Sequence, residues 1–297
     1  MNVLSLNNVV KDYKNHRAVD HVSFDMEKGK IFGLLGPNGA RKTSLIRIIT
    51  SITAGDSGTV ILTAQAIKHR THEHIGYMPE ERGLYKKMKV GDHLTYLASL
   101  KGMDRKLSKD RINYWLERLE ISSWYNKKVQ ELSKGMQQKI QFIATVLHEP
   151  SLIILDEPFS GLDPVNTNII KEEIKRLNEQ GSSIIFSTHR MESVEEICED
   201  LVLINQGKVQ ISGNVAAVKD QFKENKYALK LQNGSDLSES NLVDVTNIGE
   251  DSYELKGETE EHVHAFLREQ LIAGVRLKSF EEILPSINDI FIKLVKN

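Results

Sequence analysis

The stretch IFGLLGPNGARKTS, residues 31–44, gives the strongest indication of the fold of this chain. It opens with a short, continuous apolar run, which is typical of a strand buried on both faces. A glycine-rich turn follows, and then the start of a helix. This order of elements places successive backbone N–H groups around a phosphate group. The stretch therefore predicts a phosphate-binding loop within an α/β fold.

The residues of this loop have different expected roles. Gly36 and Gly39 fit the turn, and Lys42 is expected to contact the β- and γ-phosphates of a nucleotide. Thr43 is expected to ligate Mg²⁺ through its hydroxyl, and Ser44 offers a second hydroxyl. The candidate nucleotide-binding residues of the loop are Gly36, Pro37, Asn38, Gly39, Ala40, Arg41, Lys42, Thr43 and Ser44.

One position departs from the phosphate-loop pattern G-x-x-x-x-G-K-[ST], which has glycine directly before the lysine. Arg41 stands there. If that position requires a positive φ, a residue with a Cβ is expected to carry a strain of about 1–3 kcal/mol. The added positive charge, in contrast, favours an anion. Our hypothesis is that Arg41 weakens nucleotide binding or turnover without changing the fold.

A second apolar run, in SLIILDEP at 151–158, ends in two acidic residues. It delivers Asp156 and Glu157 to the carboxyl end of a buried strand, where α/β sheets bind their ligands. Asp156 suits Mg²⁺, and Glu157 is placed to polarise an attacking water. Taken by itself, this run could equally be a strand that ends in two solvated acids. The upstream phosphate loop weakens that reading, because phosphoryl transfer needs both parts.

Further apolar runs at 182–189 and 201–204 alternate with helical patterns such as 166–181. Such alternation indicates an α/β fold with a mostly parallel sheet, preceded by an antiparallel β region over residues 1–30. Residues 85–148 interrupt the rhythm and are interpreted as a helical insertion. The pattern predicts a first domain at 1–218 and a small α+β domain at 226–297.

Composition excludes several classes of protein. The chain has 297 residues, is 40% hydrophobic and has a formal net charge of −2, which gives no global reason to expect nucleic acid as a partner. Its lone cysteine, Cys198, can form no internal disulfide. No stretch approaches the roughly 18 apolar residues of a membrane span, and the N-terminus lacks the apolar core of a signal peptide. We therefore expect an intracellular protein.

Three more motifs extend the series: LSKGMQQ at 132–138, SGLDP at 160–164 and STH at 187–189. The order GPNGARKT, LSKGM, LIILDEP, SGLDP and STH resembles the ATP-binding subunit of ABC transporters, over about residues 1–215. The usual signature in that family is LSGGQ, from which this chain departs at Lys134 and Met136. The segment PEERGLY and the C-terminal extension resemble an exporter-type branch that includes sodium-efflux systems.

The resemblance implies roles for single residues. Ser133 and Gly135 would bind the γ-phosphate of ATP held by another subunit, and Asp163 would communicate across that dimer. His189 matches the histidine that contacts the γ-phosphate, although a lone histidine after a strand is more often structural. Tyr13 matches the aromatic residue that stacks on adenine; a core tyrosine is the alternative.

Glu80 stands where the family has a glutamine that approaches Mg²⁺. A carboxylate oxygen can still do so, while the amide donor is lost. A separate cluster in KHRTHEH, formed by His69, His72 and His74, could bind a metal, but a solvated turn is favoured over that reading.

By resemblance, then, the chain is expected to bind ATP and Mg²⁺ and to hydrolyse ATP, with Glu157 as general base, Lys42 as electrostatic stabiliser and His189 as γ-phosphate sensor. It would power export by separate membrane-spanning subunits. It would do so as a homo- or heterodimer on the inner face of the membrane, with the insertion and the loop after Glu80 facing the partner. Two alternatives stay open: a nucleotide-sensing subunit impaired by Arg41, and a soluble ABC ATPase without a transport role.

Overall fold

The computed structural model describes residues 1–14, 16–62, 65–66, 74–81, 83–232, 237 and 240–296. It divides into two compact units, Met1–Val215 and Ala216–Asn297. The boundary lies a few residues before the expected end of the first domain at 218.

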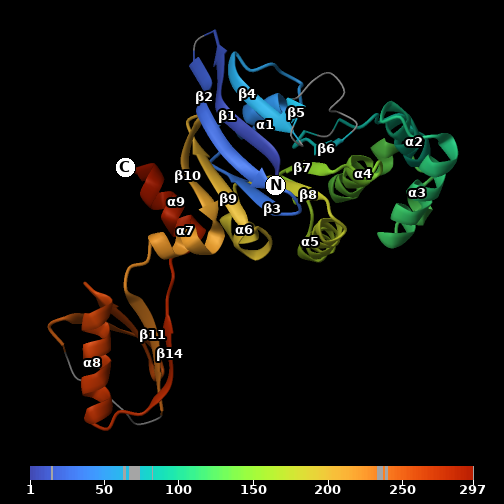
Figure 1. Cartoon of the computed structure of the whole chain (residues 1–297). Coiled ribbons are helices and arrows are strands. Elements are labelled where there is room, and N and C mark those ends of the chain that lie inside the picture. The colour runs from blue at the N-terminus through green and yellow to red at the C-terminus, as the bar shows by residue number, and fades with distance from the viewer. Residues whose placement is uncertain are drawn as a thin grey trace. The chain divides into compact units, whose positions relative to one another are not determined.

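A mostly parallel sheet forms the centre of the first unit (Figure 1). Its strand order is β10-β9-β3-β8-β7-β6, in which only the pairing of β9 with β10 is antiparallel. The strands are β3 (Ile31–Leu35), β6 (Ile75–Met78), β7 (Leu152–Asp156), β8 (Ser183–Thr188), β9 (Asp200–Asn205) and β10 (Lys208–Asn214). Every residue of β3, β7 and β8 is buried, as their continuous apolar sequences predict. Because β8 pairs in parallel with both β3 and β7, the loops after all three strands leave from one edge of the sheet.

A second, antiparallel sheet has the order β2-β1-β4-β5. Its strands are β1 (Asn2–Tyr13), β2 (His16–Glu27), β4 (Ser57–Leu62) and β5 (Gln65–Ala66). Apolar residues of this sheet, of α1 (Lys42–Ile49) and of one face of the central sheet share a single core, which includes Leu6, Ile46, Leu34 and Ile154. That core fixes α1 directly behind the loop that follows β3.

Helices α4, α5 and α6 lie on the other side of the central sheet from α1 (Figure 1). The helical segments after β6 are α2 (Val90–Leu100), α3 (Arg105–Arg118), the 3₁₀ turns η2 (Ser122–Trp124) and η3 (Val129–Glu131), α4 (Lys134–Val146), α5 (Pro164–Glu179) and α6 (Met191–Ile197). Side chains cap three of them: Asp104 for α3, Ser133 for α4 and Asp163 for α5. The region between β6 and β7 is therefore mainly helical.

The second unit is an antiparallel sheet with helices, of order β12-β13-β11-β14. Its elements are β11 (Lys226–Leu231), β12 (Val243–Gly249), β13 (Ser252–Gly257), α8 (Glu260–Ile272), β14 (Leu277–Glu282) and α9 (Ile287–Lys296), preceded by α7 (Val215–Gln221). Alternate residues such as Leu229 and Leu255 pack against Val263 and Phe266 of α8 in a core of its own. The predicted fold class, an α/β unit with a mostly parallel sheet followed by a small α+β unit, is confirmed.

Candidate nucleotide-binding site

The loop between β3 and α1 has glycines where its backbone requires them. A Cβ on Gly36 would lie 2.2 Å from the backbone oxygen of Ile204, so no larger residue fits there. Gly39 has a φ of 81°, in the left-handed region that glycine adopts without penalty. The backbone N–H of Ala40 donates to the carbonyl of Pro37 at 3.1 Å and closes the turn. The local sequence thus forms the narrow turn that the motif predicts.

Arg41 has a left-handed backbone, with φ 76° and ψ 20°, at the cap position of α1. Its carbonyl accepts from the N–H groups of Ser44 and Leu45, at 3.1 and 3.3 Å, and so begins the helix. Its side chain is exposed and makes no capping hydrogen bond to the described first turn of α1. For a residue with a Cβ, this conformation costs about 1–2 kcal/mol. The positive φ on which the strain hypothesis depended is therefore present.

Lys42 is buried, and its ammonium group faces the loop. Its Nζ donates to the carbonyl of Gly36 at 2.6 Å and to that of Pro37 at 3.3 Å. Burial lowers the pKa of Lys42, while the nearby carboxylates of Glu157 and Asp156 act in the opposite direction. The cation is consequently held where the loop bends around the position predicted for a phosphate.

Asp156 ends β7 as a buried carboxylate. Its Oδ1 accepts from the Ser187 hydroxyl at 2.8 Å, and its Oδ2 accepts from the Thr43 hydroxyl at 3.3 Å. Burial raises the pKa of Asp156 above its ordinary value, against the lowering effect of the Ser187 hydrogen bond. A carboxylate and a hydroxyl this close offer the hard oxygen ligands that Mg²⁺ prefers, so these two residues fit such an ion.

Glu157 is the next residue, with an unusual positive φ of 52°. Its Oε1 accepts from the backbone N–H of His189 at 2.9 Å and lies 2.6 Å from Nδ1 of the same residue. Its Oε2 accepts from the Thr188 hydroxyl at 3.2 Å. These contacts fix the carboxylate at the edge of the sheet with both oxygens engaged.

The loop and the acidic residues line one pocket of about 200 Å³. Its walls are Pro37, Asn38, Gly39, Ala40, Arg41, Lys42, Thr43, Ser44, Glu80, Asp156 and Glu157. Glu80 enters from the loop after β6, so three carboxylates face one lysine and the N-terminus of α1. Such a pocket can hold a phosphate chain together with a divalent cation.

Gly36 and His189 do not line the pocket, but they hydrogen-bond to Lys42 and Glu157, which do. Four other predicted site residues lie outside it. Tyr13, at the end of β1, is 39% exposed, and Lys11 Nζ lies 5.7 Å from its ring centroid. Ser133 is exposed at the start of α4, with Gly135 in its first turn. Asp163 caps α5 and accepts from the N–H and amide groups of Asn166. Within a single chain, the structure does not bring these residues to the pocket.

Ser187 and Thr188 contact the two acids but were not among the predicted site residues. Ser187 pairs with Asp156 in the register of β7 and β8, and Thr188 is the last residue of β8. The signal in the sequence is weak: it is only their place in STH, at the end of an apolar strand.

The described residues show no group of three or more potential metal-binding side chains, although His69 and His72 lie outside them. In the same part of the chain, no helix is long and apolar enough to span a membrane.

Taken together, the strand, turn, helix and second acidic strand define a P-loop nucleotide-binding protein. Comparison with known proteins makes this more specific. Residues 19–160 match the ABC transporter family model, and residues 213–295 match the ATP-binding protein DrrA1-3-like C-terminal domain. The chain is 40% identical over 301 aligned residues to the uncharacterized ABC transporter ATP-binding protein YhaQ of Bacillus subtilis (strain 168), covering 99% of this chain and 98% of that protein. It belongs to the family of ABC transporter ATP-binding proteins.

Two other similarities agree with this assignment. The linearmycin resistance ATP-binding protein LnrL of Bacillus subtilis (strain 168) is 34% identical over 210 residues, which covers 70% of this chain and 68% of that protein. A solved ATP-binding subunit of an ABC transporter superposes with a TM-score of 0.70 and 26% identity, covering 74% of this chain and 93% of the other.

Proposed function

We propose that this chain hydrolyses ATP and uses the reaction to power transport by separate membrane-spanning subunits. The observation that carries the proposal is the position of Glu157 beside the phosphate loop, where His189 and Thr188 hold its carboxylate. A fixed carboxylate at that edge is placed to accept a proton from a water attacking the γ-phosphate.

The other residues of the pocket supply binding and electrostatic stabilisation. Lys42 and the N–H groups at the start of α1 would bind the phosphates and would offset the charge that develops during transfer. Thr43 and Asp156 would hold Mg²⁺, with Glu80 as a further oxygen ligand. The ion would supply positive charge at the phosphate oxygens. His189 would sense the γ-phosphate from its place beside Glu157.

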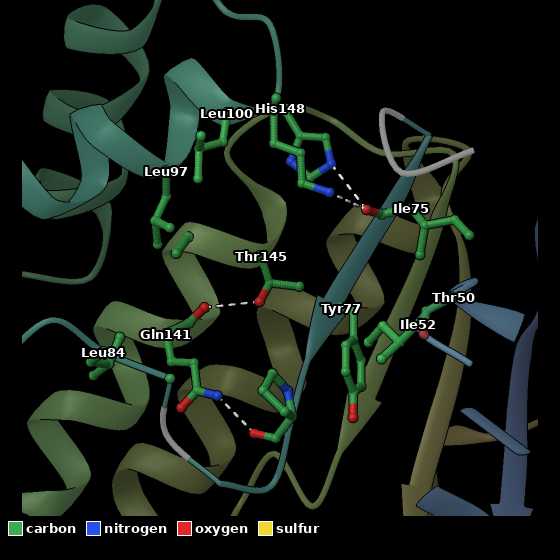
Figure 2. Close-up of a pocket in the computed structure, with 14 residues that line it drawn as sticks. Thr50, Ile52, Ile75, Tyr77, Leu84, Leu97, Leu100, Gln141, Thr145 and His148 are labelled. Atoms are coloured by element: carbon green, nitrogen blue, oxygen red, sulfur yellow. Dashed lines mark hydrogen bonds between the residues drawn. The ribbon is translucent and has the colours of Figure 1, made fainter. Parts of the chain in front are cut away.

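A groove of about 350 Å³ supports the proposed membrane partner (Figure 2). It is lined by the end of α1, β6, the loop after Glu80, and helices α2 and α4: Thr50, Ile52, Ile75, Tyr77, Pro79, Gly83, Leu84, Leu97, Leu100, Lys101, Gln141, Ala144, Thr145 and His148. Most of these side chains are apolar. We infer that a cytoplasmic segment of the membrane-spanning subunit binds here.

A second ATP-binding subunit, identical or different, completes the proposed site. Ser133 and Gly135 lie at a helix N-terminus, are at least partly exposed and lie outside this chain's own pocket, as residues that reach the ATP of another subunit would. Export is the proposed direction, and the resistance named for LnrL is consistent with it. The C-terminal unit, about 226–297, is proposed as an accessory domain, and the whole chain as peripheral to the inner face of the membrane.

The backbone of Arg41 favours a second candidate function. Arg41 has a strained φ of 76° and directly precedes Lys42. The same fold would therefore also suit a subunit that binds nucleotide but hydrolyses it slowly and that pairs with an active partner.

ATP turnover by the purified chain separates the two candidates. Phosphate release that requires Mg²⁺ and is lost in Glu157→Gln supports the first. Saturable ATP binding without release supports the second, and no ATP binding contradicts both. Co-purification of a membrane protein with the tagged chain tests the transport role, whereas co-purification with ribosomes would contradict it.

A further inference from the structure

Two glutamines on one face of α4 hydrogen-bond to the backbone of the loops that carry Glu80 and Glu157. Gln138 and Gln141 lie one helical turn apart and are only 1% and 5% exposed. Gln141 Nε2 donates to the carbonyl of Pro79 at 2.7 Å (Figure 2). Gln138 Nε2 donates to the carbonyl of Pro158 at 3.0 Å and to that of Glu157 at 3.4 Å.

These carbonyls belong to the segments that carry carboxylates into the nucleotide pocket. Pro79 directly precedes Glu80, and Pro158 directly follows Glu157; both acids line the pocket. The two segments follow β6 and β7, which are neighbours in the sheet. A single helix is therefore bonded to two catalytic loops that approach the pocket from adjacent strands.

Stability alone does not account for the amide at position 141. Gln141 Oε1 is buried and has no hydrogen-bond partner among the described residues. An unpaired buried acceptor is destabilising, and it offsets part of what the bond to Pro79 contributes. An apolar side chain of similar length would avoid that cost but would release the loop.

We propose that Gln138 and Gln141 are positioning residues that make α4 move the Glu80 and Glu157 loops as one unit. Gln141 also lines the groove described above, as does Thr145, whose hydroxyl donates to the Gln141 carbonyl at 2.9 Å. A segment bound in the groove would thus displace α4 and both carboxylates together. This link from groove to pocket rests on the proposed function, whereas the bonds to the loops do not.

Gln138→Met and Gln141→Met test the proposal in the full-length chain. Each variant is expected to lower kcat for ATP about tenfold to a hundredfold, because small displacements of reacting groups have effects of that order. The KM for ATP should change less than about twofold, because the phosphate loop is untouched. If the loss of kcat is accompanied in both variants by a fall in melting temperature, the role of the glutamines is merely structural and the proposal is overturned.

A double-mutant cycle shows whether Gln141 acts through Glu80. In a Glu80→Ala background, Gln141→Met is expected to cause no further loss of kcat. An undiminished loss in that background contradicts the proposal. Asn178→Leu is the matched control, because Asn178 also donates to two backbone carbonyls, those of Gly29 and Ser182, but lies at the far end of α5. It should change stability without changing kcat.

Hydrogen exchange provides a readout that needs no turnover. In Gln141→Met, exchange is expected to rise in the peptide covering residues 75–81 but not in one covering α8. Unchanged exchange at 75–81 would overturn the proposal even if the chain hydrolyses ATP. If the wild-type chain neither binds nor hydrolyses ATP, the proposed function fails, while increased exchange at 75–81 would still support the bond between helix and loop.

Discussion

Nδ1 of His189 lies 2.6 Å from Oε1 of Glu157, and the backbone N–H of His189 donates to the same oxygen at 2.9 Å. The residue that follows β8 therefore fixes the carboxylate of the residue that follows the neighbouring strand β7. Because one carboxylate oxygen receives both contacts from His189, a substitution at Glu157 can remove the negative charge and keep the hydrogen bond from the His189 N–H.

Glu157→Gln is expected to lower ATP turnover by about 10²–10⁴-fold, the usual contribution of a general base. The amide oxygen can still accept from the His189 N–H, so the loop should keep its shape and ATP binding should persist. Phosphate release and equilibrium binding of ATP measure the two effects separately. Turnover within a few-fold of wild type would show that another group acts as the base.

Arg41→Gly is expected to raise the free energy of unfolding by about 0.5–1 kcal/mol, the left-handed strain relieved less the backbone entropy of glycine. Tighter ATP binding and faster turnover should accompany it. Arg41→Ala is the control, because alanine removes the charge but keeps the Cβ at φ 76°. Chemical denaturation and ATP titration compare the three proteins. Identical ATP affinity and turnover in wild type and Arg41→Gly would refute the hypothesis.

The order of motifs was sufficient to predict the sheet, the phosphate loop and the two acids, because each is a local pattern of strand, turn and helix. The hydroxyls around the acids were not predictable in the same way. Ser187 reaches Asp156 only because β7 and β8 pair in one particular register, although thirty-one residues separate them in sequence. Gln141 likewise looks like any polar helix residue until the loop after β6 is packed against α4.

Asp156→Asn is expected to stabilise the chain at neutral pH in the absence of Mg²⁺. Burial raises the pKa of this carboxyl above 3.8, so the folded state holds the proton more tightly than the unfolded state. The buried carboxylate therefore destabilises the fold most once the pH exceeds the raised pKa of the folded state. This destabilisation disappears when the pH falls below the pKa of the carboxyl in the unfolded chain. Asn can still accept from Ser187.

Thermal unfolding of wild type and Asp156→Asn should be measured from neutral pH down to below 3.8. The difference in stability between the two proteins should shrink as the pH falls. A gap that is constant with pH would contradict burial as the cause. Added Mg²⁺ and ATP should stabilise the wild type more than the variant, because the variant lacks the carboxylate ligand.

His148 gives the opposite dependence on pH. Burial, followed by the charge of Lys101, lowers the pKa of this imidazole from 6.5 to about 4, while its contact with the Ile75 carbonyl at 3.3 Å acts against them. The unfolded chain therefore binds a proton at a pH where the folded chain does not. Stability from the neutral imidazole is present above 6.5 and is lost as the pH falls toward about 4.

The comparison variant is His148→Gln, whose amide can donate to Ile75 and does not titrate. Wild type should lose stability relative to this variant between pH 6.5 and about 4, and the difference should level off below that range. Denaturant titrations at several pH values measure it. Parallel stability curves for the two proteins would mean that the imidazole is hydrated rather than buried at the end of the groove. If the wild type does lose stability in this range, a segment bound in the groove should lower the pKa of His148 further, and the acid-sensitive range would widen when the partner is present.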